Sequence, residues 1–468
     1  MTGENLDIVI VGATGNLARR KLLPALYDLQ AQGLLPERGQ IIGLARSPFT
    51  NDQFRGLARE AAQKTARIDW DDEVWEDLAG RMSFLRLSDE GFAELRQQLH
   101  QPERLVYLAI PPGAFGEAVR ALAAEGLSQG TRLLIEKPFG RDLASACALD
   151  AELREVLDES QIFRIDHYLG KETVQNILVF RFGNSVFERV WNRDAIDHIE
   201  ITVAETGGVD GRGYFYEEVG ALRDIVQNHL LQVLSLLTME PPASLDAEAV
   251  RDEKVKLLRA VRPLDPARTV RGQYTRGRID GREAPGYRDE ENVAPDSDIE
   301  TFVATRVAIE NWRWAGVPIY LRTGKRLPLQ ATEIEIAFKD VPTPFFEASG
   351  IEQLQPNALT LSIQPAEEIT FSFLAKVPGP DIGVKPVTMK FSYDSAFGVE
   401  PAEAYERLIR DAIEGDQTLF VRADSVERAW QIVQPALDQP PPLRFYEAGT
   451  WGPQESEALI APLRWHLR

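Results

Sequence analysis

The segment Arg164–Lys171, Arg-Ile-Asp-His-Tyr-Leu-Gly-Lys, brings several chemically active side chains together. His167 and Tyr168 can donate directional hydrogen bonds and Lys171 carries a positive charge, a set that suits a phosphate dianion. Asp166 only accepts hydrogen bonds when ionised, so we expect it to orient a second histidine instead. The chain has only five histidines, and one inside such a cluster favours a phosphate site over a solvated loop of mixed charge.

His229 is the histidine that we expect Asp166 to orient. It lies in a stretch, residues 217–237, whose apolar residues recur at helical spacing and which also carries Asp224 and Asn228. In an α-helix Asp224 and His229 are roughly 7.5 Å apart along the axis and about 140° apart around it. We therefore expect them to share a ligand only across an edge of the helix. Taken alone, a histidine in a helix is more often a core or surface group.

Residues 6–32 have the pattern of a nucleotide-binding fold. Residues 6–12 predict a buried strand, and apolar residues at helical spacing predict a helix over residues 19–32. Glycines in the turn between them permit close backbone approach, and a helix N-terminus attracts pyrophosphate. The spacing departs from Gly-x-Gly-x-x-Gly, so a merely structural turn stays the alternative. The candidate cofactor residues in this turn are Gly12, Thr14, Gly15, Asn16 and Leu17.

The end of the second predicted strand, residues 40–45, indicates which dinucleotide binds. It is followed by Arg46, where NAD-binding folds carry an acidic residue that bonds the ribose 2′-hydroxyl. An arginine accommodates a 2′-phosphate instead, and Thr14 can add a hydroxyl to it. NADP is therefore favoured over NAD, with a surface arginine that merely closes a strand as the alternative.

Two further strands, residues 104–110 and 132–136, flank a predicted helix over residues 116–125. This alternation predicts a doubly wound parallel sheet. Lys137 comes at its carboxyl edge and is a candidate cofactor or substrate contact, unless it is simply solvated. Beyond about residue 160 the pattern changes to strand-like alternation, which predicts a large antiparallel or mixed sheet. These alternations cover residues 198–204, 333–338 and 359–364.

The composition excludes several classes of protein. A net charge of −20 argues against a nucleic-acid partner and against an anionic membrane surface. The single cysteine, Cys147, excludes an intrachain disulfide and a cysteine-based metal cluster. No metal-ligand spacing such as His-Glu-x-x-His occurs, and no metal is expected. Without a run of about 18 apolar residues or a signal-peptide core, we expect a soluble cytoplasmic protein.

The segment Arg164–Glu172 resembles the signature of the glucose-6-phosphate dehydrogenase family. Seven further segments match the family in the same order, and convergence on all of them is not credible. They are residues 12–22, 136–143, 190–194, 223–232, 250–256, 322–325 and 404–409. The resemblance covers essentially the whole chain and points to the NADP-dependent, bacterial type.

The resemblance implies a role for each candidate residue. His229 would be the general base that takes the anomeric hydroxyl proton, and Asp166 would hold its imidazole and stabilise the charged form. Phosphate and adjacent hydroxyls would be bound by His167, Tyr168, Lys171 and Lys325, and further sugar hydroxyls by Glu205 and Asp224. NADP would be held by residues 12–18 with Arg46 and Lys137, and Lys137 would also contact the substrate.

The reaction implied is hydride transfer from C1 of β-D-glucose 6-phosphate to NADP⁺. It gives 6-phospho-D-glucono-1,5-lactone in the first oxidative step of the pentose phosphate pathway. The family fold is a Rossmann-type α/β domain with a parallel sheet, followed by an α+β domain with a large, mainly antiparallel sheet. These domains are expected over residues 1–165 and 166–468. That sheet is typically the dimer surface, so a homodimer or homotetramer is expected.

Two positions depart from the family pattern. Asn16 stands where many members have aspartate, which leaves the phosphate approach intact and removes one negative charge. Gln330 stands where some members have a second cation, and Arg326 is the neighbouring candidate to replace it. The affinity for substrate is expected to change by a factor of about ten at this position.

Two other functions remain open on the sequence. A sugar oxidoreductase of the Gfo/Idh/MocA type has the same two layers and also carries Glu-Lys-Pro after a strand, as at residues 136–138. The Asp166–Lys171 segment argues against it, because an unphosphorylated sugar needs no phosphate cluster. A catalytically silent NADP-binding regulator is the second alternative, and the intact Asp224 and His229 argue against that one.

Overall fold

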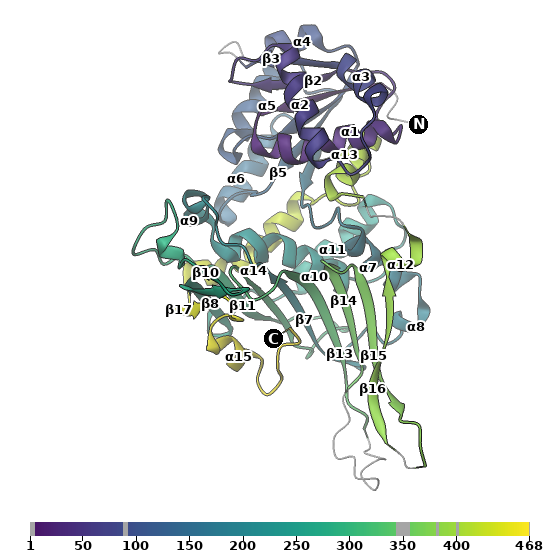
Figure 1. Ribbon diagram of the computed structural model, residues 1–468, viewed down its shortest axis with the longest axis vertical. Coiled ribbons are helices and arrows are strands. Elements are labelled where there is room, and N and C mark those ends of the chain that lie inside the picture. The colour runs from purple at the N-terminus through teal and green to yellow at the C-terminus, as the bar shows by residue number, and fades with distance from the viewer. Residues whose placement is uncertain (1–4, 88–91, 343–355, 381–382, 399–401, 468) are drawn as a thin grey trace. The chain divides into compact units, whose positions relative to one another are not determined.

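Figure 1 shows the computed structural model, which describes residues 5–87, 92–342, 356–380, 383–398 and 402–467. The chain forms two compact units. Unit 1 consists of Met1–Glu172, Pro242–Glu253 and Ala402–Glu427, and unit 2 of Thr173–Pro241, Lys254–Pro401 and Arg428–Arg468. The domain boundary expected after residue 165 stays a prediction. Among the described residues, no helix combines the length and the apolar character that crossing a bilayer requires.

Unit 1 is built on a six-stranded sheet in the order β3-β2-β1-β4-β5-β6. Its strands are β1 (Leu6–Val11), β2 (Ile41–Ala45), β3 (Met82–Arg86), β4 (Glu103–Leu108), β5 (Thr131–Glu136) and β6 (Ile162–Ile165). All neighbouring strands are parallel, and the order reverses between β1 and β4, where such sheets bind ligands. The doubly wound parallel sheet expected from the sequence is confirmed.

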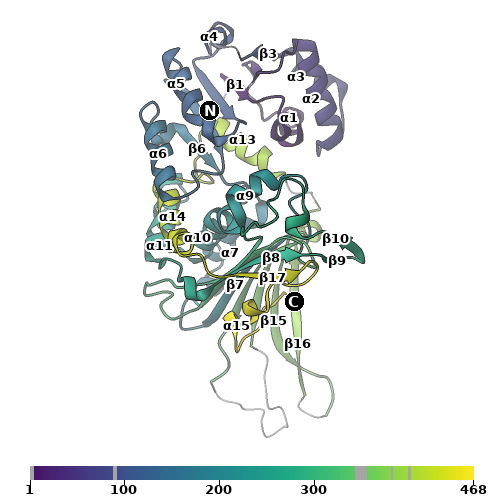
Figure 2. The ribbon, with the colours of Figure 1, turned by 90° about the vertical axis from the view of Figure 1, so that its left-hand side faces the viewer.

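The helices of the first part of unit 1 are η1 (Ala18–Leu22), α1 (Leu23–Ala31), α2 (Asn51–Thr65), α3 (Asp72–Gly80), α4 (Ala93–Gln98), α5 (Phe115–Ala124) and α6 (Leu143–Arg154). Figure 2 shows α1, α2 and α3 on one face of the sheet and α5 and α6 on the other. One more helix comes from far along the chain, α13 (Ala404–Glu414), which packs against α1. Unit 1 is therefore completed by a late part of the sequence.

Unit 2 is built on a nine-stranded sheet in the order β16-β15-β14-β13-β7-β12-β11-β8-β17. Its strands are β7 (Ile196–Ala204), β8 (Thr269–Thr275), β11 (Phe302–Val307), β12 (Ile319–Gly324), β13 (Ala331–Phe338), β14 (Ala358–Gln364), β15 (Glu368–Lys376), β16 (Val384–Ser392) and β17 (Leu443–Glu447). Only β7–β12 and β8–β17 pair in parallel. The expected large, mainly antiparallel sheet is therefore confirmed, and the three predicted strands lie in β7, β13 and β14.

The helices around this sheet include α7 (Glu172–Phe182), α9 (Gly213–Ala221), η4 (Leu222–Leu230), α10 (Leu231–Thr238), α11 (Ala247–Ala260), α12 (Tyr393–Phe397), α14 (Ala423–Asp438) and α15 (Gln454–Ile460). Of these, η4 packs against β11 and β12. The side chains of β7 that alternate toward the core, Ile199, Ile201 and Val203, are buried. The helix that carries His229 therefore packs directly on this sheet.

The prediction of one helix over residues 217–237 is wrong at its N-terminal end. Helix α9 breaks at Gly220, whose φ is 67° and ψ is 171°, and η4 and α10 follow. Glycine adopts this conformation without a steric penalty, and a glycine inside a helical pattern does not by itself reveal a break. The predicted apolar face is nevertheless buried, at Val219, Leu222, Val226, Leu230, Val233 and Leu237.

Candidate active site

The turn after β1 has the backbone geometry that a dinucleotide needs. Gly12 has a φ of 91°, and a Cβ added there would lie 2.3 Å from the carbonyl oxygen of Ala109 after β4. The amide groups of Gly12 and Ala13 both donate to the carbonyl oxygen of Leu44, at 2.7 and 3.0 Å. The glycine at the start of this turn, held close to the ends of β2 and β4, lets phosphate groups come close to the backbone. The residues present therefore fit the cofactor.

The other predicted cofactor residues of unit 1 lie at the same edge of its sheet. Arg46 directly follows β2 and is exposed, and Lys137 directly follows β5 and is partly exposed. The remaining turn residues are all at least partly exposed: Thr14, Gly15, Asn16 and Leu17. Because the carboxyl ends of parallel strands meet at one edge, these residues come together on the side where dinucleotides bind.

The segment Asp166–Lys171 forms a tight turn directly after β6. Asp166 is 2% exposed, and its Oδ1 accepts a hydrogen bond from the backbone N–H of Tyr168 at 3.0 Å. The ammonium group of Lys171 lies 4.4 Å from the centre of the Tyr168 ring, and the His167 and Tyr168 rings are 5.2 Å apart. The predicted phosphate-binding side chains are thus neighbours within unit 1.

Three residues that the sequence analysis did not single out support this turn. The hydroxyl of Tyr107 donates to Glu136 Oε1 at 2.5 Å, and Tyr405 also hydrogen-bonds Glu136. The pKa of Glu136 is raised to about 7, mainly because the carboxyl is buried and also by the nearby Asp166 charge, while the hydrogen bonds of the two tyrosines and the charge of Lys137 act in the opposite direction. The ring of Tyr405 lies parallel to that of His167, 6.4 Å away. The only sequence signal was that Glu136 and Tyr405 fall inside family segments.

In unit 2, Glu205 and Lys325 are neighbours because two parallel strands end side by side. β7 and β12 pair with Ala204 opposite Gly324, so the next residue of each strand leaves the sheet at the same edge. Lys325 Nζ donates to Glu205 Oε2 at 2.6 Å, and Lys325 is 4% exposed. An ammonium and a carboxylate fixed in this way can bind several hydroxyls of a sugar.

Asp224 and His229 lie on η4, which is a π-helix and not an α-helix. Backbone hydrogen bonds in a π-helix join residues i and i+5, so residues five positions apart lie nearly above one another. The expectation that Asp224 and His229 share a ligand only across an edge of the helix assumed about 3.6 residues per turn, a spacing that does not apply to this π-helix. His229 is 1% exposed, and Asp224 is partly exposed.

Glu300 anchors the start of η4 and was also missed. Its Oε1 accepts from the backbone N–H of Leu222 at 3.1 Å, and its carbonyl oxygen accepts from that of Ala221 at 2.9 Å. Burial raises the pKa of Glu300, although Arg271 lowers it. Glu300 is 78 residues from Leu222, so no local pattern could have revealed this contact.

Gln330 departs from the family pattern near Lys325, and both Gln330 and the neighbouring candidate Arg326 have partners within unit 2. Gln330 is exposed, and its Oε1 accepts from the backbone N–H of Thr206 at 3.1 Å. The guanidinium of Arg326 lies 3.1 Å from Glu290 and 3.5 Å from Asp210. The replacement of the second cation by Arg326 stays a prediction, and it would require these ion pairs to open.

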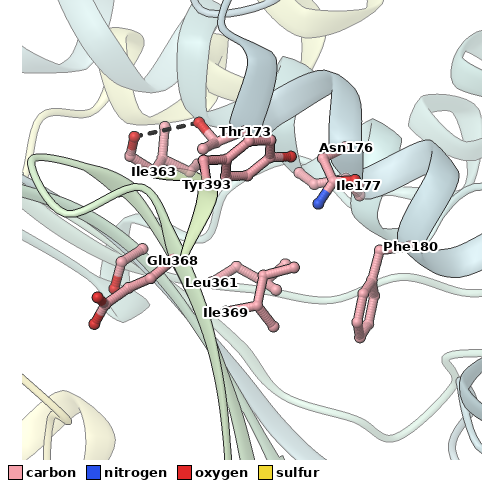
Figure 3. Close-up of a pocket in the computed structure, with 10 residues that line it drawn as sticks. Thr173, Asn176, Ile177, Phe180, Leu361, Ile363, Glu368, Ile369 and Tyr393 are labelled. Carbon is pink, nitrogen blue, oxygen red and sulfur yellow. Dashed lines mark hydrogen bonds between the residues drawn. The ribbon is translucent and has the colours of Figure 1, made fainter. Parts of the chain in front are cut away.

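A small pocket in unit 2 is separate from the predicted site residues (Figure 3). It lies between α7 and the strands β14 and β15, and its lining is largely apolar, with Ile177, Phe180 and Leu361 among its residues. The Thr173 hydroxyl donates to the carbonyl oxygen of Ile363 at 3.2 Å. None of the described residues that line it is basic, so none of them would hold a phosphate.

Within each unit, the structure brings predicted residues together. Unit 1 gathers the turn after β1, Arg46 and Lys137 at one sheet edge and forms the Asp166–Lys171 turn. Unit 2 pairs Glu205 with Lys325, and their close neighbour Tyr216 is influenced by the charge of Asp224. The pairing of Asp166 with His229 joins residues of different units and stays a prediction.

The chain matches known proteins over almost its full length. Residues 9–176 match the family "Glucose-6-phosphate dehydrogenase, NAD binding domain", and residues 178–466 match "Glucose-6-phosphate dehydrogenase, C-terminal domain". Glucose-6-phosphate 1-dehydrogenase of Dickeya dadantii is 43% identical over 98% of this chain and 97% of its own length.

Solved structures agree with these sequence matches. The crystal structure of glucose-6-phosphate 1-dehydrogenase from Mycobacterium avium is 41% identical, with a TM-score of 0.87 over 99% of this chain and 98% of its own. A glucose-6-phosphate dehydrogenase in complex with its substrate glucose-6-phosphate is 37% identical, with a TM-score of 0.91 over 100% of this chain and 99% of its own. On sequence and on fold, this chain belongs to the glucose-6-phosphate dehydrogenase family.

Proposed function

We propose that this chain oxidises β-D-glucose 6-phosphate at C1 with NADP⁺ and gives 6-phospho-D-glucono-1,5-lactone, the first oxidative step of the pentose phosphate pathway. The observation that carries the proposal is the membership of the whole chain in one enzyme family, with each side chain that the reaction needs present. The turn after β1 has the geometry for the cofactor, and the turn after β6 has the side chains for a phosphate.

The substrate would be bound both at its phosphate and at its ring hydroxyls. His167, Tyr168 and Lys171 would bind the phosphate, because an imidazole, a phenol and an ammonium provide donors and charge for a dianion. Lys325 would add a further cation. Glu205 and Asp224 would accept hydrogen bonds from ring hydroxyls and so orient C1. Lys137 would contact both the sugar phosphate and NADP.

His229 would act as the general base. Its neutral imidazole takes the proton from the anomeric hydroxyl, the C1–O1 bond becomes a carbonyl, and the C1 hydride leaves. Asp166 stabilises the imidazolium that forms, as an oriented carboxylate does for a catalytic histidine. The bound nicotinamide supplies the hydride acceptor. General-base help of this kind is typically worth about 10²–10⁴-fold in rate.

NADP is the proposed cofactor because Arg46 directly follows β2 where NAD-specific folds carry an acidic residue. A guanidinium there pairs with the 2′-phosphate that distinguishes NADP from NAD. Gly12, Thr14, Gly15, Asn16 and Leu17 would surround the pyrophosphate. The test is the ratio of kcat/KM for NADP⁺ and NAD⁺ in the wild-type protein and in Arg46→Ala, which should lose preference for NADP⁺.

The protein is proposed to act in the cytoplasm as a homodimer or homotetramer. A single cysteine suits a reducing compartment, and the large sheet of unit 2 is the proposed dimer surface. Sedimentation analysis of the purified protein gives the oligomeric state directly.

Initial-rate kinetics with glucose 6-phosphate, glucose and both dinucleotides test the proposed reaction. We expect NADPH formation with glucose 6-phosphate and little with glucose. Preference for glucose would support the Gfo/Idh/MocA alternative, and binding of NADP⁺ without turnover of either sugar would support the silent regulator. The phosphate-binding side chains of Asp166–Lys171 favour the phosphorylated substrate.

A further inference from the structure

Tyr216 is a buried tyrosine of α9 that has no role in the reaction as proposed above. It is 3% exposed, and its ring packs edge-to-face against Tyr287 with 6.0 Å between centres. The next residue, Glu217, accepts hydrogen bonds from the hydroxyls of Tyr287 and Ser297, both at 2.6 Å. These contacts hold Tyr216 in one position.

The ring of Tyr216 lies beside the pair of residues that is proposed to bind the sugar. Lys325 Nζ is 5.2 Å from the ring centre and 2.6 Å from Glu205 Oε2. A cation near an aromatic face is attracted by the quadrupole of the ring. Tyr216, Lys325 and Glu205 therefore form one cluster within unit 2.

The negative charges of three carboxylates act on the hydroxyl of Tyr216. Its pKa is raised well above the ordinary value, first by burial and then by the negative charges of Asp224, Glu205 and Glu300. The structure gives this hydroxyl no hydrogen bond to any of the described residues. This hydroxyl is not among the fully buried unpaired atoms of the described residues, so it is open to solvent and can bond a ligand group there.

We propose that the hydroxyl of Tyr216 is a further substrate-binding group, which hydrogen-bonds a ring hydroxyl of the sugar beside Asp224 and Glu205. The inference rests on the proposed function, since those carboxylates are assigned to the sugar. Ionised carboxylates only accept, so a sugar hydroxyl that donates to one of them still has lone pairs to fill. The neutral phenol is a donor placed where such a hydroxyl would be.

The substitution Tyr216→Phe removes this hydroxyl and keeps the ring beside Lys325. We expect the KM for glucose 6-phosphate to rise about tenfold, with kcat and the KM for NADP⁺ little changed, because one hydrogen bond is lost in ground and transition states alike. The 2-, 3- and 4-deoxy analogues of glucose 6-phosphate, assayed as substrates or inhibitors, identify the hydroxyl. The wild-type protein and the variant should bind equally the one analogue that lacks the hydroxyl contacted by Tyr216.

Tyr274→Phe is the matched control. It removes another tyrosine hydroxyl from the hydrophobic core that contains Tyr216, one that donates to Glu290 at 3.0 Å, and should leave the relative binding of the analogues unchanged. An unchanged KM for glucose 6-phosphate in Tyr216→Phe would overturn the inference. So would a variant that binds every deoxy analogue more weakly than the wild-type protein by the same factor. Failure of the wild-type protein to oxidise glucose 6-phosphate would instead count against the proposed function.

Discussion

At the scale of single residues, the backbone fixes the side chains that are assigned to the substrate. Both backbone polar groups of Lys325 are hydrogen-bonded. Its N–H donates to the carbonyl oxygen of Thr301 at 2.9 Å, and its carbonyl oxygen accepts from the hydroxyl of Tyr446 at 2.7 Å. The side-chain carboxylate of Asp166 is fixed directly, by a hydrogen bond from the backbone N–H of Tyr168. Groups that are already in place need little reorganisation when charge develops in the transition state.

The substitution His229→Asn tests the proposed base. Asparagine keeps a polar side chain but cannot take the anomeric proton, so kcat should fall by about 10²–10⁴-fold while the KM for glucose 6-phosphate stays close to wild type. Steady-state kinetics measure both constants. Near-normal turnover in this variant would mean that another group is the base.

Lys171→Ala removes a proposed phosphate contact and should have the opposite profile. Phosphate binding is used equally in the ground and transition states, so the KM for glucose 6-phosphate should rise while kcat changes little. An unchanged KM, together with a large loss of kcat, would show that Lys171 does not bind the phosphate but acts in the chemical step.

Glu136 should make the stability of the protein depend on pH. Its pKa in the folded state is raised from 4.5 to about 7, so the folded protein holds a proton that the unfolded chain has released. Stability contributed by this group therefore falls as the pH rises from about 4.5 to 7, by up to about 3 kcal/mol. Glu136→Gln should gain melting temperature over wild type at pH 8 and much less at pH 5. An equal difference at both pH values would contradict this assignment.

At the scale of elements, η4 is where the fold departs most from a regular pattern. Its π-type backbone, with hydrogen bonds between residues five positions apart, turns Asp224 and His229 closer to one face than an α-helix would. Irregular helix turns of this kind are frequent at functional sites. The break at Gly220 and the carboxylate of Glu300 set where this helix begins.

Gly220→Ala should destabilise the protein more than an ordinary glycine substitution does. The residue has a φ of +67°, and a Cβ would lie 2.5 Å from Glu300 Oε1. Gly126→Ala is the matched control, since Gly126 has a φ of +69° with nothing within 4 Å of an added Cβ. The control should lower the free energy of unfolding by about 1 kcal/mol from backbone strain alone. Gly220→Ala should lower it clearly more and should also lower kcat. Equal losses in chemical denaturation would show that the Glu300 contact can relax.

Strands and sheet edges could be predicted because their signals are local. The β-branched run of residues 6–11 gives β1, and Arg46 and Lys137 follow strands that composition alone reveals. The π-helix could not be predicted, since its hydrogen-bond pattern leaves no mark on the spacing of apolar residues. Glu300 and Tyr405 could not be placed either, because their partners are distant in the sequence.

At the scale of the whole molecule, the units do not follow the order of the chain. Unit 1 includes residues 402–427, and these residues supply specific contacts. Glu406 accepts from Arg67, Phe420 packs edge-to-face on Phe163 with 4.8 Å between ring centres, and Gln417 donates to the carbonyl oxygen of Ile162 at 3.2 Å. The nucleotide-binding sheet is thus stabilised by the last part of the sequence.

A fragment of residues 1–172 should therefore be less stable than the same fragment joined by a flexible linker to residues 402–427. Loss of the aromatic pair and of the buried carboxylate contact removes apolar burial and hydrogen bonds together. Thermal unfolding followed by circular dichroism compares the two fragments. Identical melting curves would show that the sheet needs nothing from the late segment.

This discontinuous arrangement also has a consequence during protein synthesis. Phe163 and the end of β6 emerge from the ribosome long before Phe420 is made, so the nascent nucleotide-binding layer remains incomplete until residue 427 has been translated. Apolar surface that stays exposed until the later segment has been synthesised makes the nascent chain prone to aggregation. We therefore expect early release of the nascent chain, or a premature stop codon shortly before this segment, to yield insoluble protein and not a shortened but stable product.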